Sequence, residues 1–169
     1  MSKLLQREDF LPLTRPARGE DRRSQILSWM KWLRDRQVSQ PPAPDAGPAD
    51  VVGGFELSAA PEGTPPNPDW RSAYAVAFLA SALREEGVVP AKDRLDWLLT
   101  CGLGARFLAQ LMFDEPGCFF VRSLEDTRGG VRLALWDNRL AIPPTAVTLL
   151  AALELEETLR MFEASGRGR

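Results

Sequence analysis

The chain has 169 residues, and its 21 basic and 23 acidic side chains leave a formal net charge of −2. This length predicts a single domain, because domains usually span about 100–200 residues. The sequence contains no histidine. That absence excludes, within this chain, a Ser-His-Asp or Cys-His nucleophilic site, a zinc site with histidine ligands and a histidine pH switch.

The two cysteines, Cys101 and Cys118, are too few for a disulfide framework and lie among apolar residues, which predicts small buried thiols. No CxxC pair or other ligand spacing is present, so we expect no metal and no cofactor. The N-terminus lacks the apolar stretch of a secretory leader, and no apolar run approaches the about 20 residues of a membrane span. These features predict a cytoplasmic protein without a membrane span.

The N-terminal residues 1–22 are rich in proline, glycine and charged side chains, which predicts an irregular tail. Basic and acidic residues alternate there, which makes nucleic-acid binding an unfavoured interpretation. The tail also contains Phe10, Leu11 and Leu13, and we expect these apolar side chains to lie across a groove of a protein partner or of this protein itself. Residues 23–164 are predicted to form the folded domain, and residues 165–169 a disordered C-terminal tail.

Within the domain, the first helix is expected to begin near Ser24 as N-cap and to end between Gln37 and Ser39. Two proline-rich stretches flank the segment Gly53–Leu57. Asp69 is a suitable N-cap for a second, alanine-rich helix, and Gly87 a suitable residue to end it.

Further along, two helices are expected over residues 91–100 and 103–112, separated at Gly102 and Gly104 because glycine disfavours helix interiors. One long helix that bends at these glycines is the alternative. Residues 118–122 and 129–136 are expected to pair as a small β-hairpin, with a turn at Asp137–Asn138. The last helix is expected to start after Ile142 and to end near Ala164. Its core face is predicted from four apolar residues, Val147, Leu150, Leu153 and Leu159.

Two parts of the chain share an order of elements: a helix, a loop, a Gly-Gly pair and an Ala/Leu-rich helix. The pairs are Gly53-Gly54, followed by Phe55, and Gly129-Gly130, followed by Val131, and they lie 130 − 54 = 76 residues apart. This pattern resembles the α/α-toroid superfamily of terpene cyclases, protein prenyltransferase β subunits and polysaccharide lyases. The resemblance implies alternating inner and outer helices joined at tight glycine turns. The predicted fold is therefore mainly α, an open α/α-hairpin repeat that is partially toroid-like, with one small β-hairpin.

The chain departs from that superfamily in three respects. It lacks the acidic DxDD motif of the cyclases, it lacks the histidine of the prenyltransferase zinc set, and its five predicted helices are too few to close a ring. The resemblance therefore implies a partial ring with two open ends. Open ends of helical repeats favour association with another protein or with a second copy.

Two interpretations of function follow. The first is a non-catalytic interaction or accessory subunit that docks a partner protein through the incomplete repeat and the N-terminal tail. The second is a carbohydrate- or isoprenoid-processing enzyme that uses loop carboxylates, with Asp126 and Asp137 as candidate catalytic residues. Asp137 could equally belong to a turn. A ligand site beside the Gly-Gly loops, or alternatively ordinary core packing, is expected for five residues: Glu56, Trp70, Tyr74, Arg132 and Trp136.

Overall fold

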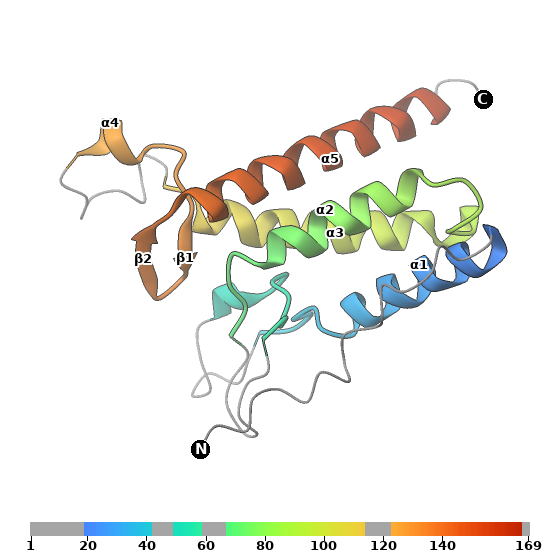
Figure 1. The fold of residues 1–169 in the computed structure, drawn as a ribbon, viewed down its shortest axis with the longest axis horizontal. Coiled ribbons are helices and arrows are strands. Elements are labelled where there is room, and N and C mark those ends of the chain that lie inside the picture. Colours follow the sequence, from blue (N-terminus) through green and yellow to red (C-terminus); the bar gives the residue numbers. More distant parts are fainter. Residues whose placement is uncertain (1–18, 42–48, 59–66, 114–122, 167–169) are drawn as a thin grey trace, which may run out of the picture.

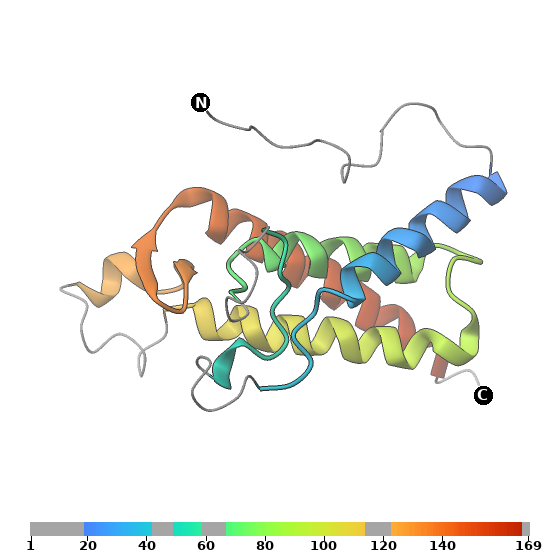
Figure 2. The same ribbon diagram turned by 90° about the horizontal axis from the view of Figure 1, so that it is seen from below.

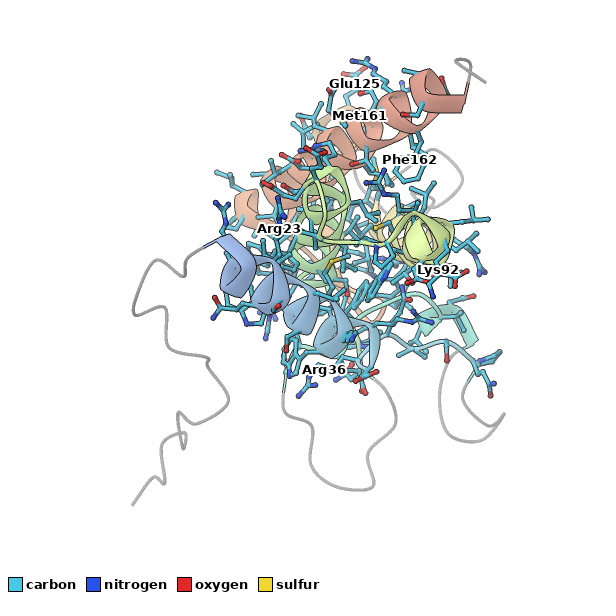
Figure 3. All side chains as sticks on the ribbon, turned by 90° about the vertical axis from the view of Figure 1, so that its right-hand side faces the viewer. Arg23, Arg36, Lys92, Glu125, Met161 and Phe162 are labelled. Carbon is cyan, nitrogen blue, oxygen red and sulfur yellow. The ribbon has the colours of Figure 1, made fainter. Side chains whose placement is uncertain are left out.

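The computed structural model describes residues 19–41, 49–58, 67–113 and 123–166. Four longer helices form its body: α1 (Gly19–Arg34), α2 (Ser72–Arg84), α3 (Arg94–Leu111) and α5 (Ile142–Gly166). Viewed along the helices, α2 lies in the middle, with α1, α3 and α5 around it (Figure 3). The α1 and α3 helices run opposite to α2 and α5, so helix direction alternates along the chain (Figure 1).

Shorter elements connect these helices. They are the 3-10 turns η2 (Ala49–Val51) and η3 (Ala91–Asp93), the one-turn helix α4 (Leu124–Thr127), and the strands β1 (Arg132–Ala134) and β2 (Asp137–Leu140). The strands pair antiparallel at the end of the molecule where α5 begins (Figure 1). The described part of the chain is thus mainly helical with one small β-hairpin, and that part of the expected fold class is confirmed.

The core fills the space where α1, α2 and α3 meet. Its fully buried side chains include Met30, Phe55, Leu79, Leu83, Phe107 and Leu111. The alanines of α2 allow its neighbours to approach closely, since a small side chain leaves room for an adjacent backbone. Seen from below, α3 lies in front of α5 and α1 crosses at an angle (Figure 2).

The start of α1 differs from the prediction, because the helix begins at Gly19 and not near Ser24. Arg22 and Arg23 have high helix propensity and extend it towards the N-terminus without a serine cap. The helix ends at Arg34, earlier than expected, because Gln37 leaves it to form a β-bridge with Phe55.

The start of α2 also differs from the prediction. Asp69 is not the N-cap; its Oδ1 accepts the backbone N–H of Arg71 at 2.8 Å, in a turn that precedes the helix at Ser72. Gly87 follows the end of α2 with a φ of +76°, a left-handed conformation that glycine adopts readily.

The two helices expected over residues 91–112 are one helix, α3, so the predicted break at Gly102 and Gly104 is wrong. Gly104 is instead a packing residue. A Cβ there would lie 2.6 Å from Val76 Cγ2 of α2, so only glycine lets the two helices approach this closely. Favourable packing along α3 outweighs the helix propensity lost at each glycine.

The hairpin pairs different residues from those expected. Residues 118–122 lie outside the described part of the chain, and β1 pairs with β2, where Asp137 and Asn138 were expected to form a turn. The turn is at Leu135 and Trp136. It lies two residues before the expected Asp-Asn turn, and Leu135 packs against the core there.

The bounds of α5 agree with the prediction to within two residues, but of its four predicted core residues Val147 alone packs against the core. Leu150, Leu153 and Leu159 are 48%, 54% and 41% exposed. The side facing the core carries Thr148, Ala151, Leu155 and Thr158 instead. Small residues and threonines suit this side because α2 approaches closely, and the Thr158 hydroxyl donates to the Ala80 carbonyl at 2.8 Å.

Candidate functional site

The aromatic residues predicted to line a ligand site begin at the start of α2. The rings of Trp70 and Tyr74 lie 5.7 Å apart, between centroids, and Tyr74 is half exposed. The Trp70 backbone N–H donates to the Leu133 carbonyl of β1 at 3.0 Å, which joins this aromatic pair to the hairpin. Trp136 lies exposed at the hairpin turn.

Arg132, the basic member of the predicted ligand site, is held by its neighbours. Its guanidinium donates to the Gln110 carbonyl at 2.7 Å and to Asn138 Oδ1 at 3.2 Å. It therefore fastens the hairpin to the end of α3. Glu56, the acidic member, accepts the Asn67 backbone N–H at 3.1 Å, a contact between two parts of the loop before α2.

The predicted catalytic carboxylates have separate surroundings. Asp126 is exposed on α4. Asp137 binds the Arg139 guanidinium, with 2.6 Å between Arg139 NH2 and Asp137 Oδ2. The hydrogen bonds from the Arg139 side chain and backbone hold the pKa of Asp137 below its ordinary value. This carboxylate is therefore ionised and neutralised by its neighbour, an arrangement typical of a structural ion pair.

The described part of the chain contains one cysteine, Cys101, and it is buried. Burial raises the pKa of the Cys101 thiol to about 12, so it stays protonated at neutral pH. No group of three potential metal-ligating side chains occurs among the residues that the structure describes. Cys118 and the tail residues Phe10, Leu11 and Leu13 lie outside the described ranges.

The two Gly-Gly loops have corresponding hydrogen bonds. In the first, the Gly53 N–H donates to the Val38 carbonyl at 2.8 Å, and the Val38 N–H donates to the Gly54 carbonyl at 2.9 Å. In the second, Gly129 and Gly130 exchange the same two bonds with Phe113, at 3.0 and 2.9 Å. The first glycine of each pair has a positive φ, +96° and +78°, which favours glycine there.

The residue after each Gly-Gly pair is tied to the start of the next long helix. The Phe55 N–H donates to Ser72 Oγ at 2.9 Å, and the Val131 N–H donates to Thr145 Oγ1 at 3.1 Å. Ser72 and Thr145 are 145 − 72 = 73 residues apart. This match aligns α2 with α5, so that each residue of α2 has a counterpart 73 positions later.

The two loops differ in what covers them. A Cβ at Gly53 would lie 2.1 Å from the Leu103 carbonyl oxygen of α3, whereas a Cβ at Gly129 would have nothing within 4 Å. Gln37 strengthens the covered loop, because its side-chain amide donates to the carbonyls of Gly53 and Thr100 at 3.1 and 2.9 Å. No local pattern indicates this role of Gln37, since its partners lie 16 and 63 residues away.

The helix alignment reveals an apolar surface that sequence reasoning missed. The buried residues of α2 include four that share one face of the helix: Ala73, Val76, Ala77 and Ala80. Their counterparts in α5 are exposed: Ala146, Leu149, Leu150 and Leu153. With Ile142, which is 84% exposed, they form one apolar row on the outer side of α5, hereafter the α5 stripe.

No described element lies beyond α5 on this side (Figure 1). A typical surface helix faces water with charged and polar residues, and the second half of α5 does so with Glu156, Glu157 and Arg160. The first half carries no charge from residue 142 to residue 153. Contiguous exposed apolar surface of this kind marks interaction sites.

A shallow apolar groove of about 90 Å³ lies between α3 and α5, floored by Val76 of α2. Met112 and Ala152 are among its lining residues, and the buried Thr148 hydroxyl there has no hydrogen-bond partner. The groove is open and small, so it is a poor fit for a drug-sized ligand.

Comparison with protein-family models, with curated proteins and with solved structures finds no match to this chain. None of the described helices combines the length and the apolar character needed to cross a lipid bilayer.

Proposed function

We propose that this protein is a non-catalytic interaction subunit that binds a partner protein through the α5 stripe. The observation that carries the proposal is the pairing of buried positions in α2 with exposed positions in α5. Val76 and Ala80 lie inside the molecule, whereas Leu149 and Leu153, their counterparts, are 60% and 54% exposed. The same face is buried in α2 and exposed in α5, so a further helix can pack against α5.

The corresponding hydrogen bonds of the two Gly-Gly loops support an α/α-repeat interpretation, in which α1–α2 and α3–α5 are two units. In the first unit, α3 covers Gly53 and packs against α2. In the second, Gly129 and the α5 stripe are the equivalent surfaces and are open. Units of helical repeats bury their apolar faces against their neighbours, so such an open end favours association.

A protein partner fits the charges better than a membrane surface does. Helices that lie on membranes carry Lys and Arg along the polar face, because the lipid headgroups are commonly anionic. The stripe is followed by Glu156 and Glu157, with Arg160 as the neighbouring base. The proposal would be contradicted if this chain bound vesicles containing phosphatidylserine as strongly as it binds its protein partner.

The test uses a photo-crosslinking residue, p-benzoylphenylalanine, in place of Leu150 at the edge of the stripe. Leu95 of α3 is the matched control position, because it is 63% exposed and apolar yet outside the stripe. Irradiation of cells of the source organism should give one adduct of defined mass for position 150 and none for position 95. The proposal fails if position 150 gives no adduct, or if both positions give the same mixture.

A further inference from the structure

We propose that the partner on the α5 stripe is a second copy of this chain, whose α5 packs antiparallel to the first across a two-fold axis. This inference rests on the proposed function and names the partner for that surface. Three properties of α5 support a second copy as the partner: the spacing of the stripe, the placement of charge along the helix, and the extent of the apolar surface.

The spacing of the stripe is that of a helix–helix seam. Ile142, Ala146, Leu149 and Leu153 follow one another at intervals of 4, 3 and 4 residues, the spacing of paired helices in coiled coils. When two such helices run antiparallel and are centred between residues 149 and 150, Leu149 of each copy faces Leu150 of the other. Ala146 then faces Leu153, so a small side chain opposes a large one and the helices fit closely.

The charges of α5 favour the antiparallel direction. The start of the helix has no acidic residue in its first turn, although the positive end of a helix dipole is stabilised by negative charge. In the antiparallel pair, Ile142 of one copy faces Glu157 of the other, and Glu156 faces Pro143. Each copy would thus supply the acidic groups that the other lacks.

The exposure of the acidic groups agrees with this arrangement. Glu156 and Glu157 contact Arg160 of their own helix, but their side chains remain 56% and 57% exposed and can accept further contacts. A parallel pair would instead place each acidic half beside the other, which is repulsive.

The extent of the surface predicts a reversible dimer. The seam covers about 16 residues, or roughly 24 Å of helix at 1.5 Å per residue. A narrow seam of that length buries less than the about 800 Å² per partner of a standard stable interface. We therefore expect a dissociation constant in the micromolar range. Two-fold pairing of one patch with itself is the commonest form of homo-oligomer.

The first test is the molar mass of the purified chain by sedimentation equilibrium, from about 1 to about 200 µM, around the expected micromolar constant. The double variant Leu149→Glu/Leu153→Glu places four glutamates in the seam and should weaken the dimer at least about 100-fold. Leu95→Glu/Leu99→Glu is the matched control, since both residues are at least 60% exposed on α3. It should dimerise like the parent.

Two results overturn the inference: a parent chain that stays monomeric throughout this range, or a stripe variant that dimerises as tightly as the control. Circular dichroism checks that each variant keeps its helices. The stripe is exposed, so its substitution should leave the fold intact. If the double variant nevertheless unfolds, the charge reversal Glu157→Arg provides the comparison and should weaken the dimer of the folded chain.

The second test determines the direction of the helices by disulfide formation. The double variant Ala146→Cys/Leu153→Cys should form a covalent dimer on mild oxidation, whereas each single variant should not. A parallel pair would give the reverse for the single variants, since like positions would then meet, and would refute the antiparallel arrangement.

The two proposals can fail separately. A monomeric parent chain, together with a crosslinked adduct at position 150 whose mass is not twice that of the chain, would refute self-association and leave the proposed function standing. The absence of any adduct at position 150 would refute the proposed function as well. An adduct of twice the chain mass, lost in Leu149→Glu/Leu153→Glu, is the result that both proposals expect.

Discussion

Two glycines in α3 allow the packing of this fold to be tested against local helix propensity. Gly102 and Gly104 lie two residues apart in the same helix, but a Cβ at Gly102 would have nothing within 4 Å. A Cβ at Gly104 would lie 2.6 Å from Val76 Cγ2 and 3.0 Å from Phe55 Cε2, inside the core. The same glycine-to-alanine change should therefore have opposite effects at the two positions.

Alanine improves helix propensity by about 1 kcal/mol at either position. At Gly104 the added methyl group also overpacks the core, at a cost of about 1–3 kcal/mol. Gly102→Ala should thus raise the free energy of unfolding by about 1 kcal/mol, and Gly104→Ala should lower it by about 1 kcal/mol. The difference is about 2 kcal/mol, which corresponds to roughly 1 M in the urea midpoint for an m-value near 2 kcal/mol/M.

The assay is equilibrium urea unfolding followed by circular dichroism, at one low protein concentration for both variants. If both substitutions raise the midpoint by similar amounts, α3 and α2 do not approach as closely as described. The explanation of Gly104 as a packing residue would then be wrong. Unequal m-values would indicate a change in the denatured state, and the comparison would then be made by thermal unfolding.

Three further predictions concern single side chains. Thr148→Val should raise the free energy of unfolding by about 1 kcal/mol, because it removes a buried hydroxyl without a partner. Thr158→Val should lower it by about 1–3 kcal/mol, because it removes the hydrogen bond to the Ala80 carbonyl, and urea unfolding measures both effects. The pKa of Asp137, followed by carboxyl NMR, should lie below its ordinary value and return to it in Arg139→Ala. Because the pKa is lower in the folded state, the ion pair stabilises the fold at neutral pH, and this stabilisation is lost as the pH falls through the folded-state pKa. Cys101 should resist iodoacetamide at pH 8 in the native chain and react in urea; rapid native labelling would contradict its burial and its raised pKa.

The sequence predicted the helices better than the way in which they pack. The bounds of α5 followed from Ile142 and the prolines after it, because proline fits the first turn of a helix. Its core face could not be read in the same way. The first half of α5 is apolar on nearly every side, so the 3–4 spacing of Leu150 and Leu153 fitted several faces. Close approach to α2, which selects Ala151, decides which face is buried.

The candidate site shows the same division between local and long-range information. The Gly-Gly pairs predicted tight turns, and Gly53 and Gly129 have the positive φ that such turns need. The correspondence between the α5 stripe and the buried face of α2 depends on the bonds of Ser72 and Thr145, which align the two helices. Those bonds join residues 17 and 14 positions apart and leave no periodic signal in the sequence.

The central claim is that the α5 stripe is a binding surface. The most direct test of this claim is the solvent accessibility of the stripe when the protein is in its native cells. A cysteine at position 149 or at control position 99 is labelled with N-ethylmaleimide, and the rate is followed by peptide mass spectrometry. In dilute purified protein both positions should react rapidly, because Leu149 and Leu99 are each 60% exposed. In cells of the source organism, Leu149→Cys should react much more slowly than in dilute solution, while Leu99→Cys reacts at a similar rate in both. Equal rates at the two positions in cells would contradict the claim.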